Sequence, residues 1–156
     1  AQPIHDKCTK RAKAMTNSDD FEDLQKTYPG AGSYRFGGSQ AQCEKLLKLV
    51  RAGKKTANCE ALREFATEPD ALPKPGRCDI ATLWDGTPTL ITRTMTVNNI
   101  RFCDVTEQQA RQESDLPLDD WRMMQQKHFS KSGGFDPEML LVFEVFEVVE
   151  DLRERL

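Results

Sequence analysis

Apolar residues repeat with helical spacing in the segment that follows a glycine-containing loop at residues 30–38. Ser39 and Gln42 form a capping box, and Gly53 offers a left-handed stop at the other end. Between these signals the apolar positions recur at i, i+3, i+4 and i+7, at Cys43, Leu46, Leu47 and Val50. The pattern predicts an amphipathic helix between Ser39 and Gly53.

Weaker start and stop signals predict four more helices. Ser18 or Asp19 can cap a short helix that ends at Tyr28-Pro29-Gly30, and residues 60–67 can form another around Leu62 and Phe65. Thr106 with Gln109 is a second capping box, which opens a helix that runs to about Glu113. Pro117 suits the first turn of a last helix, which carries Trp121, Met124 and Phe129.

The apolar period changes to two after Cys78. Residues 80–84 and 90–97 flank a turn at Asp85-Gly86 and predict a hairpin, which residues 100–105 can extend. In its second strand we expect one face to carry Ile91, Met95 and Val97, and the other Thr92, Thr94 and Thr96.

A final strand is expected at residues 140–149. It is apolar on both faces apart from Glu144 and Glu147, which is typical of a strand inside a barrel or sheet. Helices and strands alternate irregularly, which favours an α+β fold or a small barrel with peripheral helices.

The length of 156 residues predicts one domain with room for short extensions. Residues 1–18 contain four Lys and Arg residues without an apolar period, so we expect a flexible N-terminal arm at 1–18 and a folded domain at 19–156. A nucleic-acid role for this arm is less expected than a solvated terminus.

Charge and cysteine content narrow the functional classes. The 22 Lys and Arg residues against 25 Asp and Glu residues give a net charge of -3, so a site for a polyanion has to be local. The five scattered cysteines indicate neither a disulfide framework nor a zinc site, which fits a cytoplasmic protein. No apolar run reaches the roughly 18 residues of a membrane span, and no metal or cofactor is expected.

The concentrated basic segment of the predicted domain is Gly53-Lys54-Lys55-Thr56, at the end of a helix. Two ammonium groups and a hydroxyl there could hold a phosphate, or one lysine could have its pKa lowered by the other and act as a base. The alternative is that both lysines are surface charges near a helix C-terminus. The spacing is not that of a P-loop.

Other candidates also have an ordinary structural interpretation. Glu113 ends an amphipathic helix and could be a solvated carboxylate, and Ser130 lacks the G-x-S-x-G context of a hydrolase elbow. Tyr34, Phe36, Trp84 and Trp121 could stack on bases or belong to the core.

The ordered set of these segments is more informative than any one of them, and it resembles the ASCH domain family of the PUA-like superfamily over roughly residues 20–150. The segments that carry the resemblance are Tyr34-Arg35-Phe36-Gly37-Gly38-Ser39, Gly53-Lys54-Lys55-Thr56, Leu72-Pro73-Lys74-Pro75-Gly76, Trp84-Asp85-Gly86, Arg93-Thr94, Phe102-Cys103-Asp104-Val105-Thr106, Ala110-Arg111-Gln112-Glu113, Trp121, His128-Phe129-Ser130 and residues 143–149.

The resemblance implies a small PUA-like β-barrel with peripheral helices, and a cleft for RNA or a modified nucleoside beside the Gly-Lys-Lys-Thr turn. The family activities it implies are RNA cleavage and hydrolysis of an acyl amide on cytidine. For the amide hydrolases the lysine and glutamate correspond to Lys55 and Glu113. The threonine position holds Asn58, which cannot be a nucleophile, so this activity would require Thr56 as a substitute.

For ribonuclease-like members the resemblance assigns Lys54 or Lys55 together with Ser130. The leading hypothesis is therefore an RNA- or nucleotide-binding ASCH domain, with or without ribonuclease activity, that uses a local basic cleft at the turn. The alternatives are an amidohydrolase for N4-acylated cytidine and a non-catalytic interaction module. Candidate catalytic residues are Lys55, Glu113, Thr56 and Ser130, and candidate substrate-binding residues are Lys54, Asn58, Tyr34 and Arg93. The oligomeric state is left open.

Overall fold

The computed structural model describes residues 19–155, and the predicted arm at 1–18 lies outside these residues. The division into an arm and a domain therefore stays a prediction. In the described part the α-helices are α2 (Asp19–Thr27), α3 (Gln40–Arg51), α4 (Glu107–Ser114) and α5 (Leu118–Lys131), and the strands are β1 (Ser33–Tyr34), β2 (Ala57–Ala61), β3 (Cys78–Thr82), β4 (Pro88–Arg101) and β5 (Leu140–Asp151).

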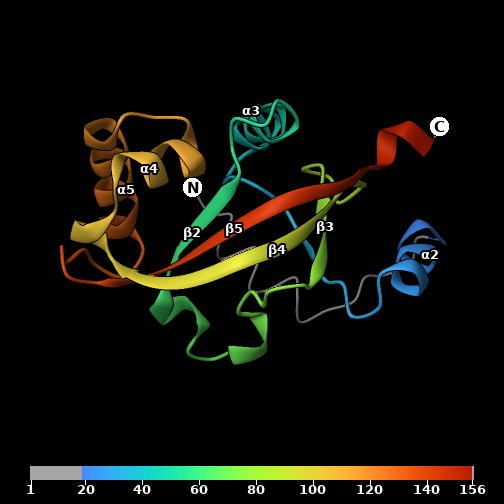
Figure 1. The fold of residues 1–156 in the computed structure, drawn as a ribbon, viewed down its shortest axis with the longest axis horizontal. Coiled ribbons are helices and arrows are strands. Elements are labelled where there is room, and N and C mark those ends of the chain that lie inside the picture. Colours follow the sequence, from blue (N-terminus) through green and yellow to red (C-terminus); the bar gives the residue numbers. More distant parts are fainter. Residues whose placement is uncertain (1–18, 156) are drawn as a thin grey trace.

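The strands form one sheet in the order β1-β3-β4-β5-β2. Two long antiparallel strands, β4 and β5, run through its middle, with α4 and α5 at one end and α2 at the other (Figure 1). The predicted α+β class is confirmed, and the final strand lies inside the sheet as expected. The predicted barrel closure is wrong, because in the part of the chain described β1 and β2 are the two edges of the sheet, and each pairs on one side only. β1 has two residues and pairs only with β3, in parallel, so it offers too little backbone to close the sheet.

Helix α3 forms where the apolar repeat predicts it. The hydroxyl oxygen of Ser39 accepts a hydrogen bond from the backbone N–H of Gln42 at 3.2 Å, which caps the first turn. Cys43, Leu47 and Val50 are buried. They belong to an apolar cluster that also contains Tyr34, Phe36, Ala81, Leu90 and Phe146.

Helices α4 and α5 cover the β2 end of the sheet. The capping box of Thr106 and Gln109 is present with both of its hydrogen bonds. Trp121 of α5 is fully buried and stacks on Phe102, with ring centroids 5.3 Å apart. The second apolar cluster of the sheet lies here, and it includes Ala57, Cys59, Ala61, Phe129, Leu141 and Phe143.

Two local predictions are wrong. Residues 60–67 do not form an α-helix, because β2 extends to Ala61 and only a short 3-10 helix, Leu62–Phe65, follows. The face predicted for Ile91, Met95 and Val97 is also broken, since Ile91 is buried whereas Met95 is 48% exposed. Register shifts between Ile91 and Thr92 and between Thr94 and Thr96 interrupt the strict alternation.

No helix within residues 19–155 is long and apolar enough to cross a membrane. In the same range Cys43, Cys59, Cys78 and Cys103 are free thiols.

Candidate functional site

The turn after α3 places its two lysines in opposite environments. Gly53 adopts a left-handed conformation with φ of 74°, which a glycine reaches without strain. The backbone N–H groups of Lys54 and Lys55 both donate to the carbonyl of Leu49, at 2.8 and 3.1 Å. The Lys54 side chain is exposed, whereas Lys55 is 2% exposed. The two ammonium groups therefore do not act together at one surface.

Every proton of the Lys55 ammonium faces an acceptor. Its Nζ donates to the carbonyl oxygens of Ala57 and Glu113, each at 2.7 Å, and to Oε2 of Glu113 at 3.3 Å. The same Nζ lies 5.7 Å from the ring centroid of Phe36. Since an ammonium group has three N–H donors, these contacts use all of them. The structure thus brings Lys55 and Glu113 together.

Glu113 is 7% exposed, so the solvated alternative for this carboxylate is wrong. Its Oε1 accepts hydrogen bonds from Trp121 Nε1 at 2.9 Å, from Gln125 Nε2 at 3.2 Å and from the Ser114 hydroxyl. Burial alone would raise the pKa of Glu113, but the charge of Lys55 and these hydrogen bonds outweigh burial and lower it. Lys55, Glu113, Trp121 and Gln125 thus form a buried ion-pair network between the turn that precedes β2 and helices α4 and α5.

Asn58 lies in a separate buried group on the opposite face of β2 from Ala57 and Cys59. Its Nδ2 lies 3.5 Å from Glu144 Oε1, and the Thr94 hydroxyl donates to Glu144 Oε2 at 2.5 Å. We call Asn58, Thr94 and Glu144 the inner polar group. The sequence analysis does not include Thr94 and Glu144 among the candidate site residues. A carboxylate inside an otherwise apolar strand could have indicated Glu144.

The remaining predicted residues are scattered. Tyr34 is buried, and its hydroxyl lies 2.7 Å from that of Thr92. Arg93 binds Glu147 at 2.8 Å. Ser130 is exposed on α5. The structure does not bring these side chains to the Lys55–Glu113 pair.

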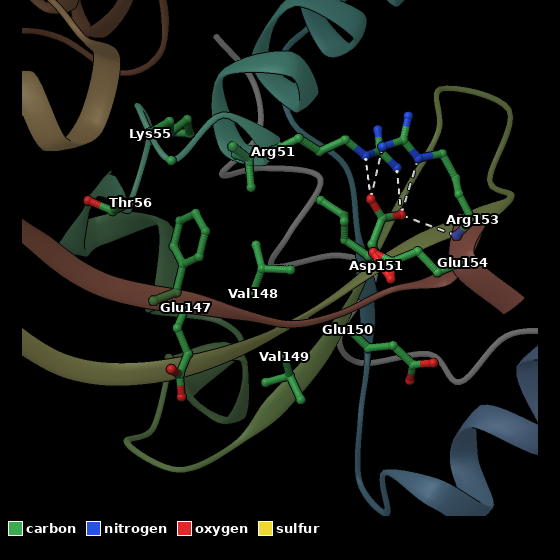
Figure 2. A pocket seen from close by; sticks show the side chains of 14 residues that line it. Arg51, Lys55, Thr56, Glu147, Val148, Val149, Glu150, Asp151, Arg153 and Glu154 are labelled. Carbon is green, nitrogen blue, oxygen red and sulfur yellow. Dashed lines mark hydrogen bonds and ion pairs between the residues drawn. The ribbon is translucent and has the colours of Figure 1, made fainter.

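Thr56 lies between two cavities at the turn, and both are also lined by Gly53. The first encloses about 650 Å³ beside β5 and α3 (Figure 2). Its arginines, Arg51 and Arg153, both bind Asp151, at 3.1 and 2.9 Å. Its other charged lining residues are Lys55, Glu147, Glu150 and Glu154, so carboxylates outnumber cations.

The second cavity is a shallow, open depression of about 640 Å³ beside α4. Its two cations, Lys54 and Arg111, are matched by Glu107 and Asp115, and Arg111 is bound to Glu107 at 2.7 Å. Neither cavity carries an excess of positive charge, so the two cavities described at the turn do not provide the predicted basic cleft. Polar uncharged groups of Thr56, Gln108 and Gln112 line the second cavity.

A family model of the ASCH domain matches residues 32–150. The chain belongs to the ASCH domain family. The fold is similar to a crystal structure of a protein from Enterococcus faecalis V583, with a TM-score of 0.76, 30% identity, and coverage of 86% of this chain and 88% of that chain. It is also similar to an ASCH domain from Lactobacillus crispatus JV V101, with a TM-score of 0.72, 25% identity, and coverage of 81% and 84%. A search of curated proteins found no match.

The fold of this ASCH domain is thus PUA-like with an open sheet. Within residues 19–155 no group of three or more His, Cys, Asp or Glu residues could hold a metal ion. His128 is half-buried, and burial lowers its pKa to about 4, so its imidazole is neutral at physiological pH.

Proposed function

We propose that this ASCH domain, residues 19–156, binds RNA or a nucleotide at the second cavity of the turn. The observation that supports this proposal is the difference between the two lysines of the turn: Lys54 is exposed, whereas Lys55 is buried. Lys54 is exposed at a cavity of about 640 Å³ that is lined by the hydrogen-bonding side chains of Thr56, Gln108 and Gln112. Lys55 fixes the wall of that cavity, because it binds Glu113 while the Thr56 N–H donates to the Gln112 carbonyl at 2.8 Å.

Binding is favoured over amide hydrolysis by the state of the candidate catalytic groups. All three N–H donors of Lys55 are engaged inside the protein. Asn58 has an amide where the resemblance implies a nucleophilic threonine. Ser130, assigned by the ribonuclease-like pattern, is exposed on α5, nine positions after Trp121, which contacts Glu113. Lys54 would therefore contact a phosphate, and the neutral polar groups would hydrogen-bond the sugar or base.

The experiment measures the affinity for a short single-stranded RNA over a series of salt concentrations. We expect the affinity to fall as salt rises, because each phosphate contact releases counterions. Lys54→Ala should weaken binding and reduce the magnitude of the salt slope by about 1. Lys45→Ala is the matched control, since Lys45 is an exposed lysine of α3 that does not line the cavity. Equal affinities for the two variants, or an affinity unchanged by salt, would reject the proposal.

Hydrolysis of N4-acylated cytidine is the second candidate, and the buried contact of Lys55 with Glu113 at 3.3 Å favours it. Incubation with N4-acetylcytidine should release cytidine if the pair is catalytic, and Lys55→Ala and Glu113→Ala should each abolish the release. Turnover that appears only in Asn58→Thr would identify the native chain as an inactive relative of the hydrolases. If no variant reacts and no RNA binds, a non-catalytic interaction module remains.

A further inference from the structure

A third cavity, of about 490 Å³, lies between α2 and the 3-10 helix that follows β5 (Leu152–Arg155). It is more enclosed than the depression beside α4. Its apolar wall comes from α2, the turn between β3 and β4, the start of β4 and the 3-10 helix, and consists of Leu24, Leu83, Pro88 and Leu152. Its volume lies in the range of small-molecule sites, which combine apolar walls with a few placed polar groups.

The charged side chains that line this cavity are mainly arginines. They are Arg51, Arg153 and Arg155, and the one carboxylate among the lining residues described is that of Asp23. The whole chain has a net charge of -3, so the sign of the charge is reversed locally. The two cavities at the turn have no such excess of cations.

Arg51 and Arg153 share a single carboxylate. Figure 2 shows both guanidinium groups reaching the carboxylate of Asp151, at distances of 3.1 Å from Arg51 and 2.9 Å from Arg153. Two positive charges thus face one negative charge, and one positive charge remains at the wall of the third cavity. Arg155 differs, because it has a carboxylate of its own, that of Glu150 at 2.6 Å.

Both shared arginines bind Asp151 through the same edge of the guanidinium group. Arg51 and Arg153 each donate to its oxygens through Nε and Nη2. Neither Nη1 atom donates to an acceptor within residues 19–155. The Nη1 atom of Arg51 is not fully buried, and the side chain of Arg153 is 62% exposed. Because each Nη1 carries two N–H donors, this outer edge can bind an oxyanion.

We propose that the third cavity binds a small organic anion that has an apolar body. Its carboxylate or phosphate group would accept hydrogen bonds from Nη1 of Arg51 and Arg153, and its apolar body would lie against Leu83 and Leu152. An inorganic anion would gain only the charged contacts, and a neutral apolar molecule only the apolar ones, so both halves of the ligand are needed for useful affinity. The third cavity does not include Lys54, so this inference does not depend on the proposed function.

The test titrates the full chain with phenyl phosphate and with benzoate, and follows the amide signals by NMR. Inorganic phosphate, acetate and phenol carry one half of the ligand each. The better of the two aromatic anions should bind with a Kd of about 1–10 mM, as expected for so small a fragment, and at least about tenfold more tightly than each half. The amide signals of Thr89 and Leu152 should shift along the same saturation curve, because both residues line the cavity. The aromatic anion that binds better identifies the preferred charged group.

Arg153→Gln should weaken binding of that anion by about tenfold, the factor that corresponds to one hydrogen bond to a charged group. The substitution leaves Asp151 bound to Arg51, so the charges at the site balance and no carboxylate loses its only cation. Arg101→Gln is the matched control, because Arg101 is an exposed arginine paired with Glu138 and does not line the cavity.

Leu83→Asp tests the apolar wall with a residue that is 38% exposed, so its replacement does not empty the core. It should also weaken binding by about tenfold or more, whereas Met123→Asp, at a side chain that is 72% exposed on α5, should leave binding unchanged. The inference is overturned if neither aromatic anion binds more tightly than the separate halves. It is also overturned if the shifted signals lie away from the cavity, or if Arg153→Gln and Leu83→Asp both bind like the native chain.

Discussion

The sharpest prediction concerns the removal of the Lys55 ammonium group by Lys55→Met. The methionine side chain has a similar length and can occupy the apolar part of the lysine's path, but it cannot donate a hydrogen bond. Two backbone carbonyls, of Ala57 and Glu113, and the Glu113 carboxylate would each lose a donor at a site that is almost completely buried. The substitution therefore leaves a buried negative charge without its cation.

The expected cost is about 3–5 kcal/mol of unfolding free energy, the range for removing one partner of a buried ion pair. In a domain of this size that loss lowers the melting temperature by roughly 6–20 °C. Urea unfolding followed by tryptophan fluorescence reports it directly, since Trp121 donates to Glu113. With an m-value of about 2 kcal/mol/M, the urea midpoint should fall by about 1.5–2.5 M.

Lys54→Met is the matched control, because Lys54 is the exposed neighbour in the same turn. It should change stability by less than about 0.5 kcal/mol. The double variant Lys55→Met/Glu113→Gln should lose less stability than the sum of the two single variants, by about 1 kcal/mol or more. If Lys55→Met unfolds at the same urea concentration as Lys54→Met, the ion-pair network does not stabilise the fold and the reasoning is refuted.

Three further predictions follow from the same region. Because the folded-state pKa of Glu113 lies below its ordinary value of 4.5, its contribution to stability is present above that value and is lost as the pH falls through the folded-state pKa; acid should therefore destabilise the native chain more than Glu113→Gln in parallel pH-dependent melts. Trp121→Phe keeps an aromatic ring but removes the N–H donor to Glu113, so chemical denaturation should show a loss of about 1.5–3 kcal/mol, and no loss would contradict this bond. An NMR titration of the His128 ring should have its midpoint at about 4, and a midpoint near 6.5 would show that burial does not govern this histidine.

The sequence predicts helices best where the local signals alone determine them. The boundaries of α3 and α4 follow from capping residues and apolar spacing, and the structure contains the corresponding side-chain bonds at Ser39 and Thr106. The helix predicted at residues 60–67 does not form, for a different reason. β2 gains its backbone partners from β5, which lies far away in the sequence, and that pairing overrides a weak helical pattern.

The candidate site could be predicted only in part, because some of its contacts also depend on pairing between strands that lie far apart in the sequence. Lys55 and Glu113 could be paired through the family resemblance, but nothing in the sequence distinguishes a buried Lys55 from an exposed Lys54. The contact of Asn58 with Glu144 depends on the register of β2 against β5, and the contact of Thr94 with Glu144 depends on the register shifts between β4 and β5. Such shifts have no reliable sequence signal, which explains why the single face predicted for Ile91, Met95 and Val97 does not form.

The C-terminal end of α4 is held by hydrogen bonds from the turn that follows α3. Helix α4 has eight residues, and two carbonyls near its C-terminus, those of Gln112 and Glu113, are occupied by Thr56 and Lys55 rather than by water. So short a helix is marginal in isolation, and its termination is completed by a segment that precedes it by more than fifty positions. An inserted residue between Gly53 and Ala57 would therefore displace the donors that complete the end of α4, even though the sequence of α4 itself is unchanged.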